Sequence, residues 1–430
     1  MAKPTIQARP IPWLLFLFLA TILFFVYHDL SNAKSPLGNY DGSQDLIVGM
    51  VQDGSISRRL AVIALGFFAM ITLVRYRAID RLRIKGSLGW ILGGFAAWAI
   101  ISPIWAEDRV LTLTRVTVFA ILCVAAVAIA NRFSLREIIL WAFFTSGSYL
   151  AIGVFAELLF GTFRPLSSGY RFAGTLHPNG QGINCTLLLL SGVAAADLEK
   201  HRSTLFRICA FVGFAFLVLT GSRTAFAAAL LALAIYLWVV CSKRAKLVAV
   251  YALSIVFCLL LLVLGNTFLP DLKSAVMLGR VDASDGSFNG RTGIWDEIRP
   301  YIQRRPILGY GYGGFWTPSH ITEISEEEKW GIPNSHSAYL DTLLTLGVVG
   351  LVAYVLLLCA GIRSAFRLQK LLQNTAYAFW GVLLVFCAID GLLESAPIEP
   401  SLLMFLSAVV LAQLGFVHPT PLRGANGKIA

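Results

Sequence analysis

Long apolar runs separated by short polar connections make up most of the chain. A helix of about 20 apolar residues crosses the roughly 30 Å hydrocarbon core of a bilayer, so each run of that length is a candidate membrane span. The candidate spans are 12–28, 60–75, 88–105, 111–130, 138–160, 180–197, 205–220, 223–241, 246–264, 337–360, 376–393 and 401–417. This pattern predicts an all-α polytopic membrane protein with about twelve transmembrane helices.

The longest polar interruption separates two groups of spans. We expect three regions: residues 1–264 with the first nine spans, 265–335 as a loop, and 336–430 with the last three spans and a tail. A connection of this length without internal structure is uncommon. We therefore expect the loop to be partly helical.

One stretch of the loop, 290–305, has the period of an amphipathic helix. Its apolar positions recur at helical spacing, at Ile294, Trp295, Ile298 and Ile302. Asn289 is the expected N-cap and Pro306 the expected end. The glycine-rich residues 309–314 are expected to form a flexible turn.

Composition supports a membrane protein, and charge predicts its orientation. Hydrophobic residues make up 57% of the chain and charged residues 14%, whereas soluble domains carry about 25% charged residues. The net charge of +11 comes mainly from short connections on one side of the predicted membrane, such as 75–85 and 243–246. Basic connections tend to stay in the cytoplasm, so we expect cytoplasmic N- and C-termini and an outer location for 265–335. The sequence has no basic stripe interleaved with aromatics, which argues against a nucleic-acid partner.

The residue types that bind metals show no convincing pattern. The seven cysteines lie within or beside apolar runs, and none forms a C-x-x-C pair. We interpret them as small core residues. Asp282 and Asp285 in V-D-A-S-D-G are weak evidence for a metal, so no metal site is expected.

A histidine stands where the loop meets the tenth predicted span. Pro333 followed by Asn334 or Ser335 supplies a helix-start signal, which places His336 in the first turn of that span. Ionisable groups in spans are rare and indicate function. A neutral imidazole can take a proton from a hydroxyl near neutral pH. The alternative is an interfacial histidine that faces lipid headgroups.

Several arginines lie on the same predicted outer side. Arg223 in T-G-S-R-T-A-F and Arg291 in N-G-R-T-G-I-W-D stand at expected helix starts, and Arg171 precedes the sixth span. Helix N-termini and guanidinium groups together suit phosphate oxygens. The alternative for each arginine is pairing with a nearby acid or with lipid phosphates.

Other polar residues gather at this outer boundary. His177, Asn179 and Tyr339 are candidate contacts for glycan hydroxyls, although a helix-capping role is the simpler interpretation of His177. Four acids are candidate counter-ions of the arginines or contacts for acceptor hydroxyls: Glu157, Asp390, Glu394 and Glu399.

Three motifs resemble those of one family of membrane enzymes. His336-Ser337, nine further residues, and then Gly347-Val348-Val349-Gly350 resemble the H-[NSQ]-x9-G-x-x-G signature of bacterial O-antigen ligases. The segment G-R-T-G-I-W-D followed by R-P-I-L-G-Y-G-Y-G-G-F, and the Ser222-Arg223 pair, resemble motifs of the wider O-antigen ligase and polymerase superfamily. The three motifs occur in the family's order within roughly 210–360.

The resemblance implies a metal-independent glycosyltransferase of the bacterial inner membrane that needs no cofactor and works at the periplasmic face. Its donor would be a glycan on undecaprenyl diphosphate. Its acceptor would be a sugar hydroxyl, on the lipid A core for a ligase or on another lipid-linked repeat for a polymerase. Arg223, Arg291 and Arg171 would stabilise the departing diphosphate, and His336 would be the general base.

Two alternatives stay open. The H-P-N-G segment at 177–180 is closer to exopolysaccharide or O-antigen polymerases, which leaves the acceptor undecided. A lipid-linked glycan flippase or transporter is the alternative outside enzymes. Transporters often place broken helices near the bilayer midplane in two corresponding halves, and this sequence shows no matching halves.

Overall fold

The computed structural model describes residues 31–34, 56–75, 82–167, 169–240, 251, 255, 291–328 and 331–417. The predicted span 12–28 lies outside these residues, as do Asn289, Asp282 and Asp285, and of the predicted span 246–264 only residues 251 and 255 are described. The three regions expected from the sequence stay predictions.

The described residues fold into helices, and no strand occurs among them. Their bounds are α2 Ser31–Lys34, α4 Ile56–Arg75, α5 Gly86–Ile101, η2 Ser102–Ile104, α6 Arg109–Arg132, α7 Leu135–Leu159, α8 Pro178–Leu198, η3 Lys200–Arg202, α9 Ser203–Leu219, α10 Arg223–Val240, α13 Arg291–Arg304, α14 Pro318–Glu328, α15 Ala338–Leu372, α16 Thr375–Asp390 and α17 Leu402–Phe416. The all-α prediction is confirmed for this part of the chain, and ten predicted spans coincide with helices.

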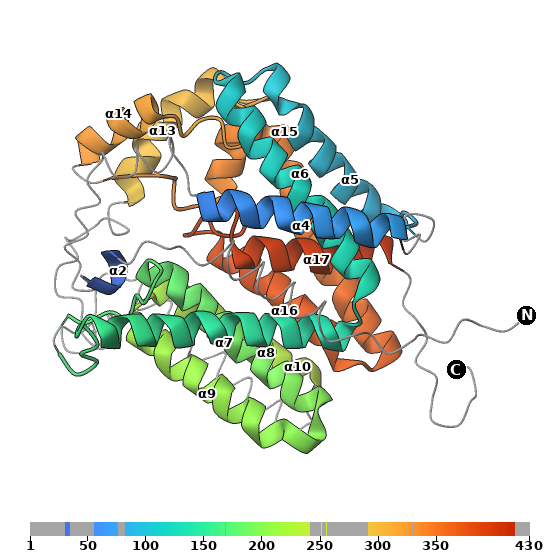
Figure 1. The fold of residues 1–430 in the computed structure, drawn as a ribbon. Coiled ribbons are helices and arrows are strands. Elements are labelled where there is room, and N and C mark those ends of the chain that lie inside the picture. Colours follow the sequence, from blue (N-terminus) through green and yellow to red (C-terminus); the bar gives the residue numbers. More distant parts are fainter. Residues whose placement is uncertain are drawn as a thin grey trace, which may run out of the picture.

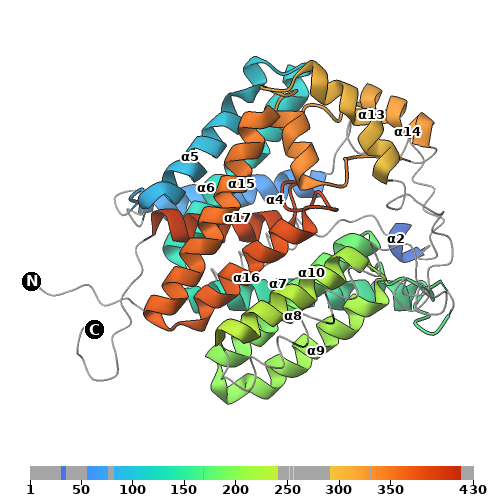
Figure 2. The same cartoon turned by 180° about the vertical axis from the view of Figure 1, so that it is seen from behind.

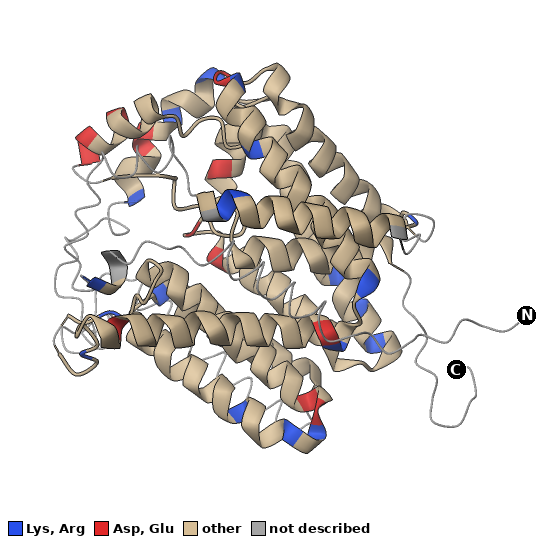
Figure 3. Ribbon diagram, viewed as in Figure 1, with Lys and Arg blue, Asp and Glu red and all other residues tan. Residues whose placement is uncertain are grey.

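Seven of the described helices are long and apolar enough to cross a membrane, and α16 and α17 are shorter apolar helices. Figure 3 shows Lys, Arg, Asp and Glu mostly near helix ends, with long uncharged stretches between them. The chain is a multi-pass membrane protein. The number of spans and the side on which the termini lie stay predictions.

The helices form two groups that α16 joins. One group holds α7, α8, α9 and α10, and the other holds α4, α5, α6, α15 and α17 (Figures 1 and 2). Helix α16 packs on α8 and α10 in the first group and on α15 in the second. Fully buried Trp380 and Phe386 on α16 lie in the shared apolar core, so α16 fixes the position of one group against the other.

Side chains cap several helices at their first residues. Ser134 and Glu137 form a capping box at the start of α7, and Asp108 accepts a hydrogen bond from the Leu111 amide at the start of α6. Ser401 does the same for α17. These side chains satisfy amides that have no partner inside their own helix.

Helices α8, α10, α15 and α17 begin where α9 and α16 end, and we call this end of the bundle the site end. Helices α13 and α14 lie over the beginning of α15 (Figure 1). They enclose a second apolar cluster that includes Ile294, Ile298, Phe315 and Ile321. The amphipathic helix expected at 290–305 is confirmed as α13, whereas sequence reasoning did not identify α14.

Helix α15 is kinked at Gly347, whose φ of 67° is in the left-handed region. The kink leaves carbonyls without helical partners, and the preceding turn supplies donors. The Tyr310 amide donates to the Leu344 carbonyl at 3.1 Å and the Gly311 amide to Thr345 at 2.8 Å. The Val348 amide donates to Pro306 at 2.8 Å. The expectation of a flexible turn was therefore wrong, because these bonds fix the turn against α15.

We expect Gly347→Ala to destabilise the protein. A Cβ atom at this position would lie 2.0 Å from the Ile307 carbonyl oxygen, and left-handed backbone is strained for alanine. The free energy of unfolding should fall by at least about 2 kcal/mol, measured by thermal unfolding in detergent.

Gly94→Ala in α5 is the matched control. Its Cβ would meet nothing within 4 Å, so it should leave the unfolding temperature nearly unchanged. Equal shifts for the two variants would contradict this role of Gly347.

Candidate active site

His336 lies one residue before the N-cap of α15, in a segment that crosses the site end. Ser337 is the N-cap and its side chain accepts from the Leu340 amide. The expectation that His336 lies in the first turn of the helix, after a start signal at Asn334 or Ser335, was therefore wrong. The helix starts later because His336 has a φ of 53°, which ends any helical continuity.

Hydrogen bonds from neighbouring residues hold His336 in this left-handed backbone conformation. The His336 amide donates to Asn334 Oδ1 at 3.0 Å, and the Ser337 amide donates to Ser335 Oγ at 3.2 Å. Trp295 Nε1 on α13 donates to the Ser335 carbonyl at 2.9 Å. A strained backbone persists only where its surroundings determine it, and such positions gather at functional sites.

Glu394, in the connection between α16 and α17, joins three predicted site residues. Its Oε1 accepts from Arg291 Nη2 at 2.5 Å and from Asn179 Nδ2 at 2.8 Å. Its Oε2 lies 3.7 Å from His336 Nδ1. The carboxylate therefore holds one charged contact to α13, one hydrogen bond to α8 and one contact to the histidine segment.

Arg171 extends this network toward α9 and α10. Its Nη2 donates to Asn179 Oδ1 at 2.9 Å, and its Nε donates to the Thr220 carbonyl at 2.8 Å. Thr220 opens the short turn that leads to Arg223. The sequence was right that Arg223 and Arg291 are the first residues of their helices, so the structure brings all three predicted arginines to the site end.

The electrostatics of Glu394 follow from these contacts. Burial raises the pKa of this carboxyl. The contacts with His336 and Arg291 lower it by more than burial raises it, so the pKa of Glu394 is below its ordinary value. Glu394 is therefore ionised at neutral pH. Arg291 is 8% exposed, and a buried guanidinium of this kind needs a charged partner.

Chemically, the site can bind anions and can exchange a proton. Arg291 contacts Glu394 and Arg171 contacts Asn179, so two guanidinium groups of the kind that bind anions lie in one network. The His336 imidazole is of the residue type that most often transfers protons in enzymes. In the residues that the structure describes, no group of three His, Cys, Asp or Glu side chains is placed to hold a metal ion.

Comparisons with known proteins show what parts of this chain resemble. The family model described as O-Antigen ligase matches residues 208–355. The ComP-specific O-oligosaccharyltransferase of Acinetobacter baylyi (strain ATCC 33305 / BD413 / ADP1) is 27% identical over 202 residues. These residues cover 45% of this chain and 36% of that protein. Both matches support the resemblance to the O-antigen ligase superfamily.

The names of the family model and of the relative both describe enzymes that act on glycans. The segment that the family model matches, 208–355, includes Arg223, Arg291 and His336. Arg171, Asn179 and Glu394 lie outside it. The structure therefore adds residues from two other parts of the chain to the site.

His177 and Tyr339 make contacts within the protein. His177 is the N-cap of α8, and its Nδ1 accepts from the Asn179 amide at 3.3 Å, which confirms the capping role. The Tyr339 hydroxyl donates to the Ala388 carbonyl at 2.7 Å and thereby joins α15 to α16. Contacts of His177, Asn179 or Tyr339 with a glycan stay predictions.

Three of the four predicted acids, Glu394, Glu157 and Asp390, differ in their contacts. Glu394 is the counter-ion of Arg291. Glu157 accepts from the amides of Ala173 and Gly174 and from the Tyr170 hydroxyl, and so orders the segment that carries Arg171. Asp390 is buried one helical turn before Glu394, and no hydrogen-bond partner of its carboxylate is found in the described part of the chain.

Asp341 was not identified from the sequence, although it supports the histidine segment. This buried residue in the first turn of α15 accepts from Trp316 Nε1 at 2.9 Å, from the Ser335 amide at 3.2 Å, and from the Ser395 hydroxyl. It therefore ties the segments before and after α15 together. An aspartate within an apolar run was the available signal.

We expect Asp341→Ala to loosen the histidine segment. Three donors would lose a buried acceptor, so the free energy of unfolding should fall by about 2–4 kcal/mol. Thermal unfolding measures the loss, and limited proteolysis should show faster cleavage near 331–337. Asp296→Ala is the control, because Asp296 pairs with Arg299 at the exposed surface and should cost less than about 1 kcal/mol.

The pKa of Glu399 gives a prediction for pH. The residue as a whole is partly exposed, but its carboxyl group is buried. This burial and the nearby Asp341 raise the pKa of Glu399 from 4.5 to about 7. A raised carboxyl pKa means that the folded state holds the proton more tightly than the unfolded state. Stability should therefore fall as pH rises from about 4.5 to about 7.

We expect Glu399→Gln to reduce this decline, because the variant cannot ionise. Unfolding temperatures of both proteins between pH 4.5 and 8 test it. Identical slopes for the two proteins would contradict the raised pKa of Glu399.

Proposed function

We propose that this protein transfers a glycan from a lipid diphosphate to an acceptor hydroxyl at the site end. The observation that carries the proposal is the Glu394 contact with both Arg291 and His336. It joins a cation suited to a diphosphate and a base suited to a hydroxyl within one network. The match of residues 208–355 to the O-antigen ligase family model supports glycan transfer in general.

In the proposed reaction, the acceptor oxygen attacks the anomeric carbon of the donor sugar. The bond between that carbon and the diphosphate oxygen breaks, and its electron pair leaves with the diphosphate. Arg291, Arg223 and Arg171 stabilise the charge that develops on the leaving group. Arg291 uses one of its two Nη atoms for Glu394, and a guanidinium has further donors.

His336 takes the proton of the acceptor hydroxyl. Its Nδ1 faces Glu394 at 3.7 Å. We therefore assign Nε2 as the atom that takes the proton from the acceptor hydroxyl. The negative carboxylate stabilises the imidazolium that forms, and the fixed segment 334–337 keeps the ring oriented. Glu394 acts here as a positioning residue.

We further propose that the donor lipid is undecaprenyl diphosphate, that the membrane is the bacterial inner membrane, and that the site faces the periplasm. The basic connections on the opposite side of the predicted spans support this orientation. The reaction needs no metal in this proposal, because the arginines supply the positive charge. His177, Asn179 and Tyr339 remain candidate contacts for glycan hydroxyls.

The acceptor is a sugar hydroxyl, as for a ligase of the lipid A core or a polymerase of lipid-linked repeats. The relative is named a ComP-specific O-oligosaccharyltransferase, which adds an acceptor other than a glycan as a further possibility to test. A flippase would move the lipid-linked glycan without releasing the lipid diphosphate.

We expect the purified protein, with a lipid-diphosphate-linked glycan and an acceptor, to release the lipid diphosphate and form a glycosylated acceptor in the presence of a chelator. His336→Ala should lower transfer by at least about 100-fold, the usual minimum for losing a general base. Quantification of both products measures this.

His201→Ala is the matched control, because His201 is exposed in η3 at the other end of the bundle. It should transfer at the wild-type rate. Near-wild-type transfer by His336→Ala would refute the base, and movement of the lipid without release of diphosphate would favour a flippase.

A further inference from the structure

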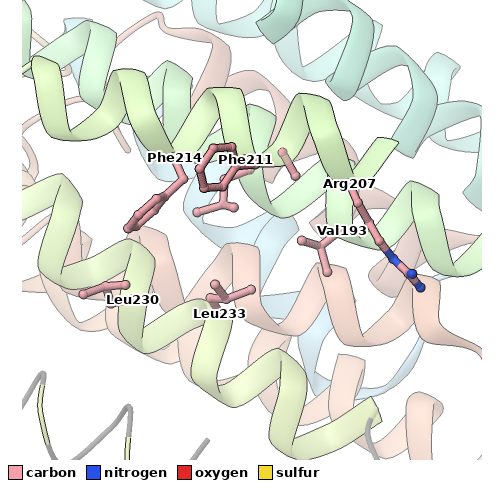
Figure 4. Close-up of a pocket in the computed structure, with 8 residues that line it drawn as sticks. Val193, Arg207, Phe211, Phe214, Leu230 and Leu233 are labelled. Carbon is pink, nitrogen blue, oxygen red and sulfur yellow. The ribbon is translucent and has the colours of Figure 1, made fainter. Parts of the chain in front are cut away.

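Glu399 lies in the connection between α16 and α17, close to the segment that carries His336. Its neighbours fix this part of the connection, because the Ile398 carbonyl accepts from the Tyr312 hydroxyl at 3.2 Å and Ser401 is the N-cap of α17. Glu399 does not line the apolar groove between α8, α9 and α10, whose side chains Figure 4 shows. Its carboxyl group is buried against polar and charged groups instead.

A side-chain hydrogen bond joins the Glu399 carboxyl group to Asn334. The Oδ1 atom of Asn334 accepts from the His336 amide at 3.0 Å, and a backbone amide can only donate. The side-chain NH2 group of Asn334 is therefore the donor to Glu399. Asn334 thus links the buried carboxyl group to the backbone of His336, whose φ of 53° needs support from its surroundings.

Titratable and charged groups from several elements face Glu399. Asp341 on α15 and Glu394 in the same connection make its ionisation less favourable, and Arg115 on α6 makes it more favourable. The Tyr312 hydroxyl also interacts electrostatically with it. Burial and the two acids outweigh the favourable contacts, so the pKa of Glu399 is raised to about 7. Both protonation states of Glu399 are therefore populated near neutral pH.

We propose that ionised Glu399 is a positioning residue for the general base, because it holds Asn334 and, through Asn334, the backbone of His336. This inference rests on the proposed function, since it takes His336 to be the base. A hydrogen bond to a carboxylate is about twice as strong as one between neutral groups. Misplacement of a reacting group by about 1 Å can lower a rate by roughly 100-fold. Transfer should therefore be faster when Glu399 is ionised than when it is protonated.

Ionisation of Glu399 has opposite effects on stability and on the proposed transfer. The raised pKa means that the ionised carboxyl group destabilises the fold, whereas its hydrogen bond to Asn334 becomes stronger. Proteins retain destabilising groups of this kind where activity requires them. A variant without the charge should thus lose activity at high pH without losing stability, which separates positioning from a purely structural role.

The pH dependence of kcat tests this inference. Glu399→Gln keeps an acceptor for Asn334 but cannot ionise. The ratio of the wild-type kcat to the variant kcat should be close to 1 at about pH 5 and rise to roughly 5 at about pH 8. The KM for the donor should stay the same, because the change affects the base rather than donor binding.

Glu326→Gln is the matched control, because Glu326 is exposed on α14. Its kcat should equal that of the wild type throughout this pH range. A kcat of Glu399→Gln equal to that of the wild type at about pH 8 would overturn the inference.

An exchange of the two side-chain types tests the hydrogen bond itself. Asn334→Asp keeps an acceptor for the His336 amide but places a second carboxyl group against Glu399, and should lower kcat by roughly tenfold at about pH 8. Addition of Glu399→Gln should restore kcat to within about threefold of the wild type, because an amide then donates from position 399 to position 334. No restoration in the double variant would show that Glu399 does not act through Asn334.

Hydrogen–deuterium exchange separates this inference from the proposed function, since it needs no transfer. In Glu399→Gln, the amides of residues 334–337 should exchange roughly fivefold faster than in the wild type at about pH 8, and equally fast at about pH 5. Equal exchange at both pH values would overturn the inference. Absence of transfer by the wild-type protein, with the exchange difference present, would instead refute the proposed function while the contact between Glu399 and the histidine segment stands.

Discussion

The buried carboxylate of Glu394 is the constraint on which the site depends. It accepts from Arg291 and Asn179 and faces His336, so three chain segments meet at one charged group. Desolvation of such a pair is costly, and removal of one partner leaves the other charge buried without compensation. The protein therefore keeps these segments together, and the resulting geometry is suited to a preorganised site.

The kink at Gly347 gives the glycine of the sequence signature a physical role. Its backbone conformation and its closeness to Ile307 both favour glycine. The carbonyls freed by the kink accept from the turn that follows α13. The kink thereby fixes α13, which carries Arg291, relative to the first part of α15, which follows His336. A residue eleven positions beyond the histidine thus helps to place the arginine.

Hydropathy predicted the helices well because each span must bury its backbone hydrogen bonds within one continuous apolar segment. The helix starts at Arg223 and Arg291 were predictable for a similar reason, because neighbouring residues in the sequence determine them. Glu394 was one of four candidate counter-ions, but its pairing with Arg291 was not predictable, because Arg291 lies 103 residues away in the sequence. The left-handed conformation of His336 depends on Asn334 and on the segments packed around it, and sequence patterns do not encode such contacts.

The charged residues of the site lie in polar connections, and apolar helices hold these connections together. Glu394, Asn334 and His336 lie in connections, where polar backbone and charge can be satisfied by nearby groups. Apolar helices α8, α9, α10 and α16 fix where these connections meet. The proposed reaction, between a membrane-bound donor and a hydroxyl from water, would require both environments close together. The turn between α9 and α10 provides that boundary, because Arg223 begins an apolar helix on one side and Arg171 connects to Asn179 and Glu394 on the other.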